Sequence, residues 1–228
     1  MKSQTLYLSC IFLWLMLFQE PCSCSKTTTC FKEYQFTFPV SIQPTQDTLN
    51  IGDTIWVGME ILKEVINEVD SQMVIIEDSI DFSVKMTIDM LDSFIVTNIG
   101  DTILYSPTTD FEIVKNIGEV SIFFAASDPH INYFELFLDK SETGQKIHFG
   151  LLPSMSGKFT ISFGNLTRDL EDITLEGNCE AVISKLHYNV NELKSDNNYH
   201  IFEKEIPSKW YASLQEYKNF GGFSFVVK

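Results

Sequence analysis

Basic residues are scarce in this sequence. Its 228 residues include 16 lysines and arginines against 31 aspartates and glutamates, which gives a formal net charge of −15. Such an acidic surface repels phosphate backbones and anionic lipid headgroups. The composition therefore argues against nucleic acid as a partner, and against attraction of the folded chain to a membrane by charge.

The sequence also lacks the motifs of familiar catalytic and metal sites. It has no G-x-S-x-G elbow, no H-E-x-x-H motif and no glycine-rich phosphate-binding loop. The cysteines and the four histidines show no zinc-ligand spacing, and the histidines are expected at surface or half-buried positions. We therefore predict no catalytic residue, no metal ligand and no cofactor.

No apolar run in the sequence reaches the roughly 20 residues that a membrane-spanning helix needs. The run from Leu6 to Phe18 follows Lys2 and leads into small residues around Ser23, which is the layout of a secretory signal. We predict a signal peptide over residues 1–23. The protein is expected to be exported to the cell envelope, as an outer-membrane lipoprotein or in the periplasm or at the cell surface.

Cys24 is the predicted site of lipidation and the first residue of the mature chain. Ser23 is the small residue that bacterial lipoprotein signals place directly before the acylated cysteine. Pro21 departs from the usual Leu or Val three positions upstream, and ordinary cleavage between Ser23 and Ser25 is the alternative. Residues 24–33 are expected to form a tether, so that the membrane is reached only through a lipid anchor.

Two cysteines of the exported chain remain if Cys24 is acylated. Cys30 and Cys179 then form an even pair in an oxidising compartment, where disulfides persist. We predict a disulfide between them that ties the first strand to the C-terminal part of the chain.

The dominant pattern in the mature chain has a period of two residues. Between Tyr34 and Ile42 every second residue is apolar, which predicts a half-buried strand. Pro39 cannot donate a ladder hydrogen bond, so this strand is expected at an edge or with a bulge. Gly52–Asp53 predicts a tight turn with a positive φ at the glycine. Further strands are predicted over residues 55–61, 73–76, 82–91, 120–124, 158–163, 179–188 and 220–227.

Two hairpins and one helix complete the expected elements. Gly100–Asp101 predicts a hairpin between residues 94–98 and 102–105, and residues 139–144 predict another between 133–138 and 146–151. Residues 62–69 fit either a short helix or a long strand connection.

The late helix is predicted to begin at Pro207 and to include Trp210. About ten short strands with one or two short helices predict an all-β, mainly antiparallel, immunoglobulin-like β-sandwich over residues 34–228. A break between two subdomains is placed near residues 165–178.

Two segments carry a resemblance to a known group of proteins. Phe36–Val40 is a strand that ends in Pro-Val, and Asp47–Trp56 contains a Gly-Asp-Thr-Ile turn. In these segments the chain resembles a group of exported proteins of unknown function from Bacteroidetes-type bacteria. The resemblance implies an immunoglobulin-like β fold and an envelope location. It implies no activity, because the group has no established reaction.

The expected function is that of a non-catalytic accessory binding or assembly module, whose partner is an unknown envelope protein or a glycan. Such a module would use exposed aromatic side chains, and Trp56, Trp210 and Tyr199 are the candidates. The alternative is a secreted carbohydrate-active enzyme on a β-sandwich. Two carboxylates about 5 to 10 Å apart suffice for glycoside hydrolysis, and the 31 acidic residues supply candidates without identifying a pair.

Overall fold

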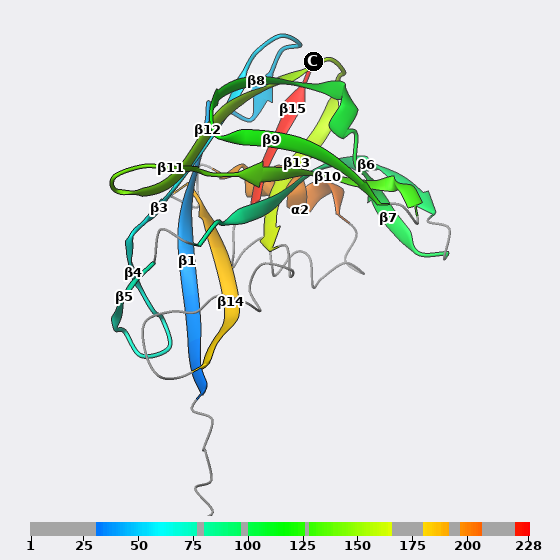
Figure 1. Cartoon of the computed structure of the whole chain (residues 1–228). Helices are drawn as coiled ribbons and strands as arrows, with labels where there is room; N and C mark the ends of the chain where they lie inside the picture. The colour runs from blue at the N-terminus through cyan, green and yellow to red at the C-terminus, as the bar shows by residue number, and fades with distance from the viewer. Residues whose placement is uncertain are drawn as a thin grey trace, which may run out of the picture. The chain divides into compact units, whose positions relative to one another are not determined.

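Figure 1 shows the computed structural model of the chain. The structure describes residues 31–76, 80–96, 100–125, 128–165, 180–191, 197–206 and 222–228. The predicted signal peptide, residues 166–178 and the helix predicted from Pro207 lie outside the described residues. So do Cys24, Cys30, Cys179 and Trp210.

One of the two main sheets, sheet A, has β1 and β3 near its centre. Its strands follow the order β11-β12-β3-β1-β14, and β8 also pairs with β12. Their bounds are β1 Phe31–Gln43, β3 Ile55–Leu62, β8 Phe111–Ile117, β11 Asp139–Lys140, β12 Gly144–Pro153 and β14 Glu180–Val190.

The second main sheet, sheet B, follows the order β2-β15-β13-β6-β10-β9, and β7 also pairs with β6. Its strands are β2 Thr48–Leu49, β6 Ser83–Val96, β7 Thr102–Tyr105, β9 Glu119–Ala125, β10 Asp128–Phe137, β13 Gly157–Asn165 and β15 Gly222–Val227. The 3₁₀ turn η1, Thr108–Asp110, leads into β8. The short helix α2, Tyr199–Glu205, packs with Leu91 and Val226 on the face of sheet B away from sheet A.

The two sheets face each other across one apolar core, which confirms the predicted all-β sandwich. Phe111 of sheet A meets Phe159 of sheet B edge to face, with ring centroids 5.3 Å apart and an interplanar angle of 88°. Each fully buried Phe contributes roughly 1.5 to 3 kcal/mol relative to an exposed one. The largest fully buried aromatic side chains are Phe36, Phe38, Phe134, Phe149, Phe159, Phe223 and Phe225. Because inward positions alternate with outward ones, each sheet also presents an outer face.

The predicted first strand is present as β1, which lies between β3 and β14 in the strand order. Its ladder with β14 covers Phe31–Val40, but its ladder with β3 covers only Val40–Gln43, so at Pro39 the strand is paired on one side. The expected edge position therefore holds at Pro39, and the strand also has a register irregularity between Tyr34 and Gln35. The ladder between β1 and β3 begins at Val40, so the missing N–H of Pro39 costs that ladder no hydrogen bond.

One predicted hairpin is confirmed and the other is wrong. β6 pairs antiparallel with β7, with Val96 opposite Thr102. In contrast, β10 pairs within sheet B and β12 within sheet A, so residues 133–138 and 146–151 are not hairpin partners. The chain changes sheet after Phe137, and the short β11 forms the hairpin with β12 instead.

Residues 62–69 form strands and a turn, so the short-helix alternative is wrong. β4, Glu64–Ile66, pairs antiparallel with β5, Met73–Ile75. The predicted turn at Gly52 is confirmed, with φ at +93°. Elsewhere, β8 and α2 were not anticipated from the sequence.

Candidate functional site

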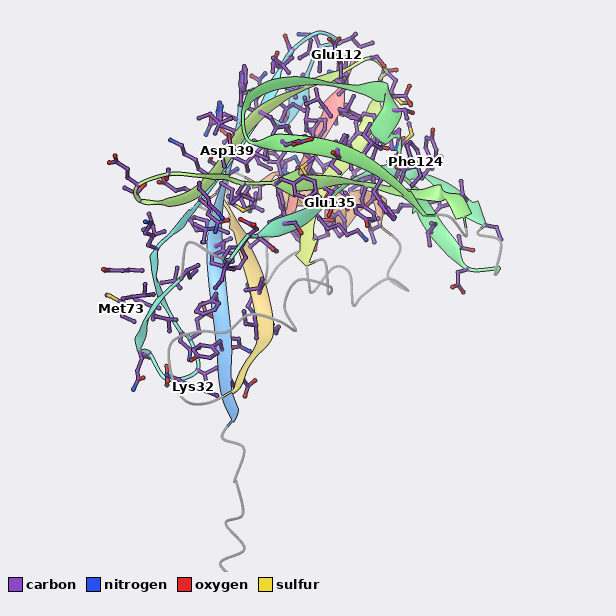
Figure 2. The ribbon with its side chains drawn as sticks, viewed as in Figure 1. Lys32, Met73, Glu112, Phe124, Glu135 and Asp139 are labelled. Carbon is purple, nitrogen blue, oxygen red and sulfur yellow. The ribbon has the colours of Figure 1, made fainter. Side chains whose placement is uncertain are left out.

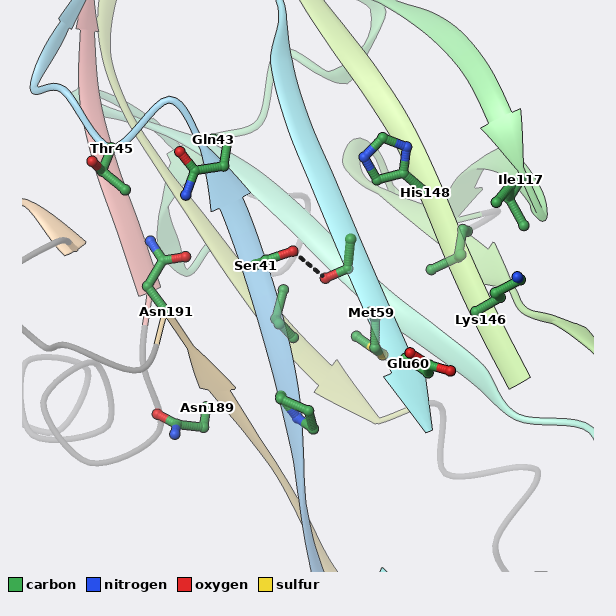
Figure 3. A pocket seen from close by; sticks show the side chains of 14 residues that line it. Ser41, Gln43, Thr45, Met59, Glu60, Ile117, Lys146, His148, Asn189 and Asn191 are labelled. Carbon is green, nitrogen blue, oxygen red and sulfur yellow. Dashed lines mark hydrogen bonds between the residues drawn. The ribbon is translucent and has the colours of Figure 1, made fainter. Parts of the chain in front are cut away.

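An open groove of about 680 Å³ lies on the outer face of sheet A (Figure 3). Outward side chains of β1, β3, β12 and β14 line it, because these neighbouring strands place alternate residues on this face. Ser41 and Gln43 of β1, Glu60 of β3 and Asn189 of β14 are exposed to solvent there. Lys146 and His148 of β12 are half-buried.

Gly58 forms the floor of the groove between Ser41 and His148. A Cβ at this position would lie 2.7 Å from Ser41 Oγ and 3.3 Å from His148 Cδ2. The Ser41 hydroxyl donates a hydrogen bond of 3.3 Å to the carbonyl oxygen of Gly58 (Figure 3). Because Gly58 has no side chain, nothing projects from the sheet at this point, and the space of the groove stays open above it.

One of the lining residues, His148, belongs to an aromatic pair. The indole of Trp56 stacks on the imidazole of His148, with centroids 5.2 Å apart and an interplanar angle of 4°. Gly150 lies beside the indole, since a Cβ there would approach Trp56 Cζ3 to 3.3 Å. Two glycines on the outward face thus let a flat, half-exposed ring system lie close to the sheet.

Polar groups around the stacked pair offer varied hydrogen bonding. Gln43 and Asn189 carry amides, which both donate and accept, while Lys146 donates and Glu60 accepts. The Glu60 carboxylate accepts a hydrogen bond of 3.1 Å from the Thr143 hydroxyl, which fixes its direction. Among the lining residues that the structure describes, Glu60 is the one carboxylate. The groove can therefore hold a polar ligand with one flat face, and it presents no carboxylate pair from these residues.

The outer face of sheet B carries a polar network around Asp89. The Ser106 and Thr87 hydroxyls both donate to the Asp89 carboxylate, the latter over 3.2 Å, and Thr87 lies 2.7 Å from Ser162 Oγ. Burial raises the pKa of the Asp89 carboxyl, against the hydrogen bonds from Ser106 and Thr87 and the charge of Lys85, which lower it.

Of the predicted binding aromatics, Trp56 stacks on the lining residue His148 but is not itself one of the residues that line the groove. Tyr199 lies on α2, where it packs against the small apolar cluster around Ile201 and Phe202, and it does not line the groove. His148 was expected to be a surface or half-buried ring and is half-buried, but its stacking on Trp56 was not anticipated. The available signal was the pair of glycines, Gly58 and Gly150, at outward positions of alternating strands.

Two further observations concern the described part of the chain. No group of three or more His, Cys, Asp or Glu side chains within it could hold a metal ion. No helix in that part is long and apolar enough to cross a bilayer.

No known family matches the sequence, and no curated protein matches it. Among solved structures, the second type II cohesin module from the adaptor ScaA scaffoldin of Acetivibrio cellulolyticus aligns with a TM-score of 0.26 and 12% identity, covering 66% of this chain and 94% of that one. A type II cohesin domain from the cellulosome of the same organism aligns with a TM-score of 0.25 and 13% identity, covering 65% and 91%. Scores this low carry no argument, so the fold class stands on the strand pairing described above.

Proposed function

We propose that the chain is an exported, non-catalytic binding module, and that its groove on sheet A binds a glycan. The observation that carries this proposal is the flat Trp56–His148 stack beside a glycine floor, surrounded by amide, hydroxyl and carboxylate groups.

A sugar ring matches this arrangement in two ways. One face of a pyranose presents C–H groups that can lie against an aromatic ring, while its hydroxyls need partners that both donate and accept. Gln43, Ser41 and Asn189 supply such partners at exposed positions. Binding sites commonly combine an apolar surface with a few placed polar groups. The net charge of −15 favours a neutral glycan over an anionic one.

The location in the cell envelope belongs to the same proposal. The apolar run with its charged start and the Ser23–Cys24 pair support export and lipidation at Cys24. A module held at the surface in this way would meet extracellular or wall glycans. Intact-mass analysis of protein extracted from membranes tests it: the mass should be that of an acylated chain beginning at Cys24. An unmodified chain beginning at Ser25 would contradict lipidation.

The groove is tested by binding to an array of neutral and acidic oligosaccharides, followed by calorimetry with the best neutral binder. Trp56→Ala should weaken binding about tenfold or more, which corresponds to about 1.4 kcal/mol. The matched control is Phe123→Ala, which removes an exposed ring from sheet B and should leave affinity unchanged. Equal affinity in wild type and Trp56→Ala would overturn the assignment of the groove.

The same assay separates binding from hydrolysis. A binding module should leave the oligosaccharide intact. Release of reducing ends by the wild type, lost in Glu60→Gln, would instead establish a carbohydrate-active enzyme.

A further inference from the structure

Exposed aliphatic side chains are concentrated on the hairpin of β4 and β5. Ile66 and Met73 are 62% and 66% exposed, although they are directly opposite each other in the ladder. Figure 2 shows the Met73 side chain pointing away from β1. The hairpin strip, as we name this set, consists of Leu62, Ile66, Val69, Met73 and Ile75.

Folding of the hairpin does not account for the strip. The opposite side of the same ribbon already supplies the core contact, since Val74 is buried and Val65 packs against the main core. A two-stranded ribbon with one buried face usually carries polar residues on the other. Here three of the four outward residues of the ladder, Ile66, Met73 and Ile75, are apolar as well, and Glu64 is the fourth. A mainly apolar outward face is typical of a surface that contacts something else.

The hairpin is held rigidly against β1 by Asn67, which is fully buried. Its Oδ1 accepts from the backbone N–H of Gln35 over 2.9 Å and of Val69 over 3.2 Å. Its Nδ2 donates to the carbonyl oxygen of Glu33 over 3.2 Å. These bonds fix the turn on the irregular start of β1, so the strip is presented to solvent in one orientation.

The turn of the hairpin lies at the beginning of the described chain. Lys32 Nζ is 3.5 Å from the Asp70 carboxylate and donates to Gln72 Oε1 over 3.1 Å. Cys24 precedes Lys32 by eight residues. A fully extended segment of that length spans at most about 28 Å. A lipid on Cys24 would therefore keep the hairpin close to a bilayer, at a high effective concentration.

We propose that the hairpin strip inserts into the headgroup region of a zwitterionic bilayer beside the anchor, which rests on the lipidation included in the proposed function. Glu64, Glu68 and Asp70 are exposed around the strip. These carboxylates repel anionic headgroups, so apolar contact and not charge provides the attraction.

The test supplies the tether artificially, so that it does not depend on lipidation. The chain from residue 24 onward, carrying an N-terminal hexahistidine, is held on phosphatidylcholine vesicles that contain nickel-chelating lipid and brominated acyl chains. Met73→Trp should be quenched by the bromines well beyond the wild type, whose own tryptophans set the background. Ile75→Trp serves as a second position if Met73→Trp folds poorly.

The matched control is Val96→Trp, which places the indole at an equally exposed apolar position on β6 of sheet B. Quenching of Met73→Trp or Ile75→Trp no greater than that of Val96→Trp would overturn the proposal. Loss of quenching in the Ile66→Ser variant of Met73→Trp would support it. The proposal would also be overturned if sedimentation showed dimers that depend on the hairpin strip and quenching were absent. That result would assign the surface to a second copy of the chain. An unacylated native protein would refute the anchor while leaving the quenching result intact.

Discussion

Phe31 and Glu180 are opposite each other at the start of the parallel ladder between β1 and β14. Each follows a cysteine in the sequence, namely Cys30 and Cys179. Both cysteines lie outside the described residues. Neighbouring strands are about 4.8 Å apart, and disulfides join residues whose Cα atoms are about 4.4 to 6.8 Å apart. The pairing of Cys30 with Cys179 stays a prediction from the sequence.

We expect Cys30 and Cys179 to be disulfide-bonded in exported protein. Reduction should lower the free energy of unfolding by at most about 4 to 5 kcal/mol, because the bond closes a very long loop in the unfolded chain. Peptide mapping without reductant should recover the two cysteines in one linked fragment. Alkylation of both thiols in oxidised, denatured protein would contradict the bond.

Gly58→Val should fill the groove on sheet A. Its Cβ alone would lie 2.7 Å from Ser41 Oγ, so the serine and His148 must shift and the space above the floor is lost. We expect glycan affinity to fall tenfold or more while circular dichroism retains the β spectrum. Gly164→Ala on β13 is the control, because a Cβ there meets nothing within 4 Å. Unchanged affinity in Gly58→Val would contradict the groove as the binding site.

Asn191→Ala should destabilise the end of the β1–β14 ladder. The Asn191 side-chain oxygen accepts from the buried N–H of Ile42 over 2.8 Å, and the residue has φ at +45°. Loss of the acceptor costs about 1 to 3 kcal/mol, and a positive φ adds roughly 1 to 2 kcal/mol for alanine. Asn191→Gly should lose less, because glycine tolerates this φ. Urea denaturation of both variants checks the order, and equal losses would refute the backbone contribution.

Asp89→Asn should gain stability over the wild type as pH rises. Because the pKa of folded Asp89 is above its ordinary 3.8, the folded wild type binds more protons there than the unfolded chain. The stability of the wild type therefore falls as pH rises from about 3.8, the ordinary pKa, through the higher pKa of the folded state. The stability advantage of Asp89→Asn over the wild type should grow in total by about 1.4 kcal/mol for each unit by which folding raises the pKa of Asp89.

Urea denaturation from acidic to neutral pH measures this difference. Ser106→Ala removes a hydrogen bond that lowers the pKa of Asp89, so in that variant the loss of stability with rising pH should be larger in total and should extend to higher pH. A stability advantage of Asp89→Asn that shrinks with rising pH would contradict the prediction.

The sequence predicts the strands better than their arrangement. Alternation identifies β3, β6 and β13, because one side of each strand faces the core. It does not say which sheet a strand joins, since inward positions look the same in both, and this is why residues 133–151 were misassigned. β8 was missed because Val114 lies outward beside Ile113, which interrupts the alternation.

The groove could not be predicted for a related reason. Trp56 and His148 meet only once β3 and β12 are paired in a register that places Gly58 opposite His148. Trp56 and His148 are far apart along the chain, and the sequence between them gives no sign of that register. Likewise, the burial of Asp89 depends on Ser106 arriving from beyond β7, a tertiary contact that local pattern does not encode.

Two ladders among the described strands are parallel, and they determine when the two main sheets can be completed during folding. β1 pairs with β14, and β2 pairs with β15 at Val226 and Val227, so an early strand of each sheet depends on a late one. A chain that is synthesised from its N-terminus cannot pair β1 with β14, or β2 with β15, until nearly all of the sequence has been made. Such non-local pairing places the protein among slow folders, on a scale of milliseconds to seconds. During that interval one side of β1 is an open strand edge, vulnerable to pairing with another chain.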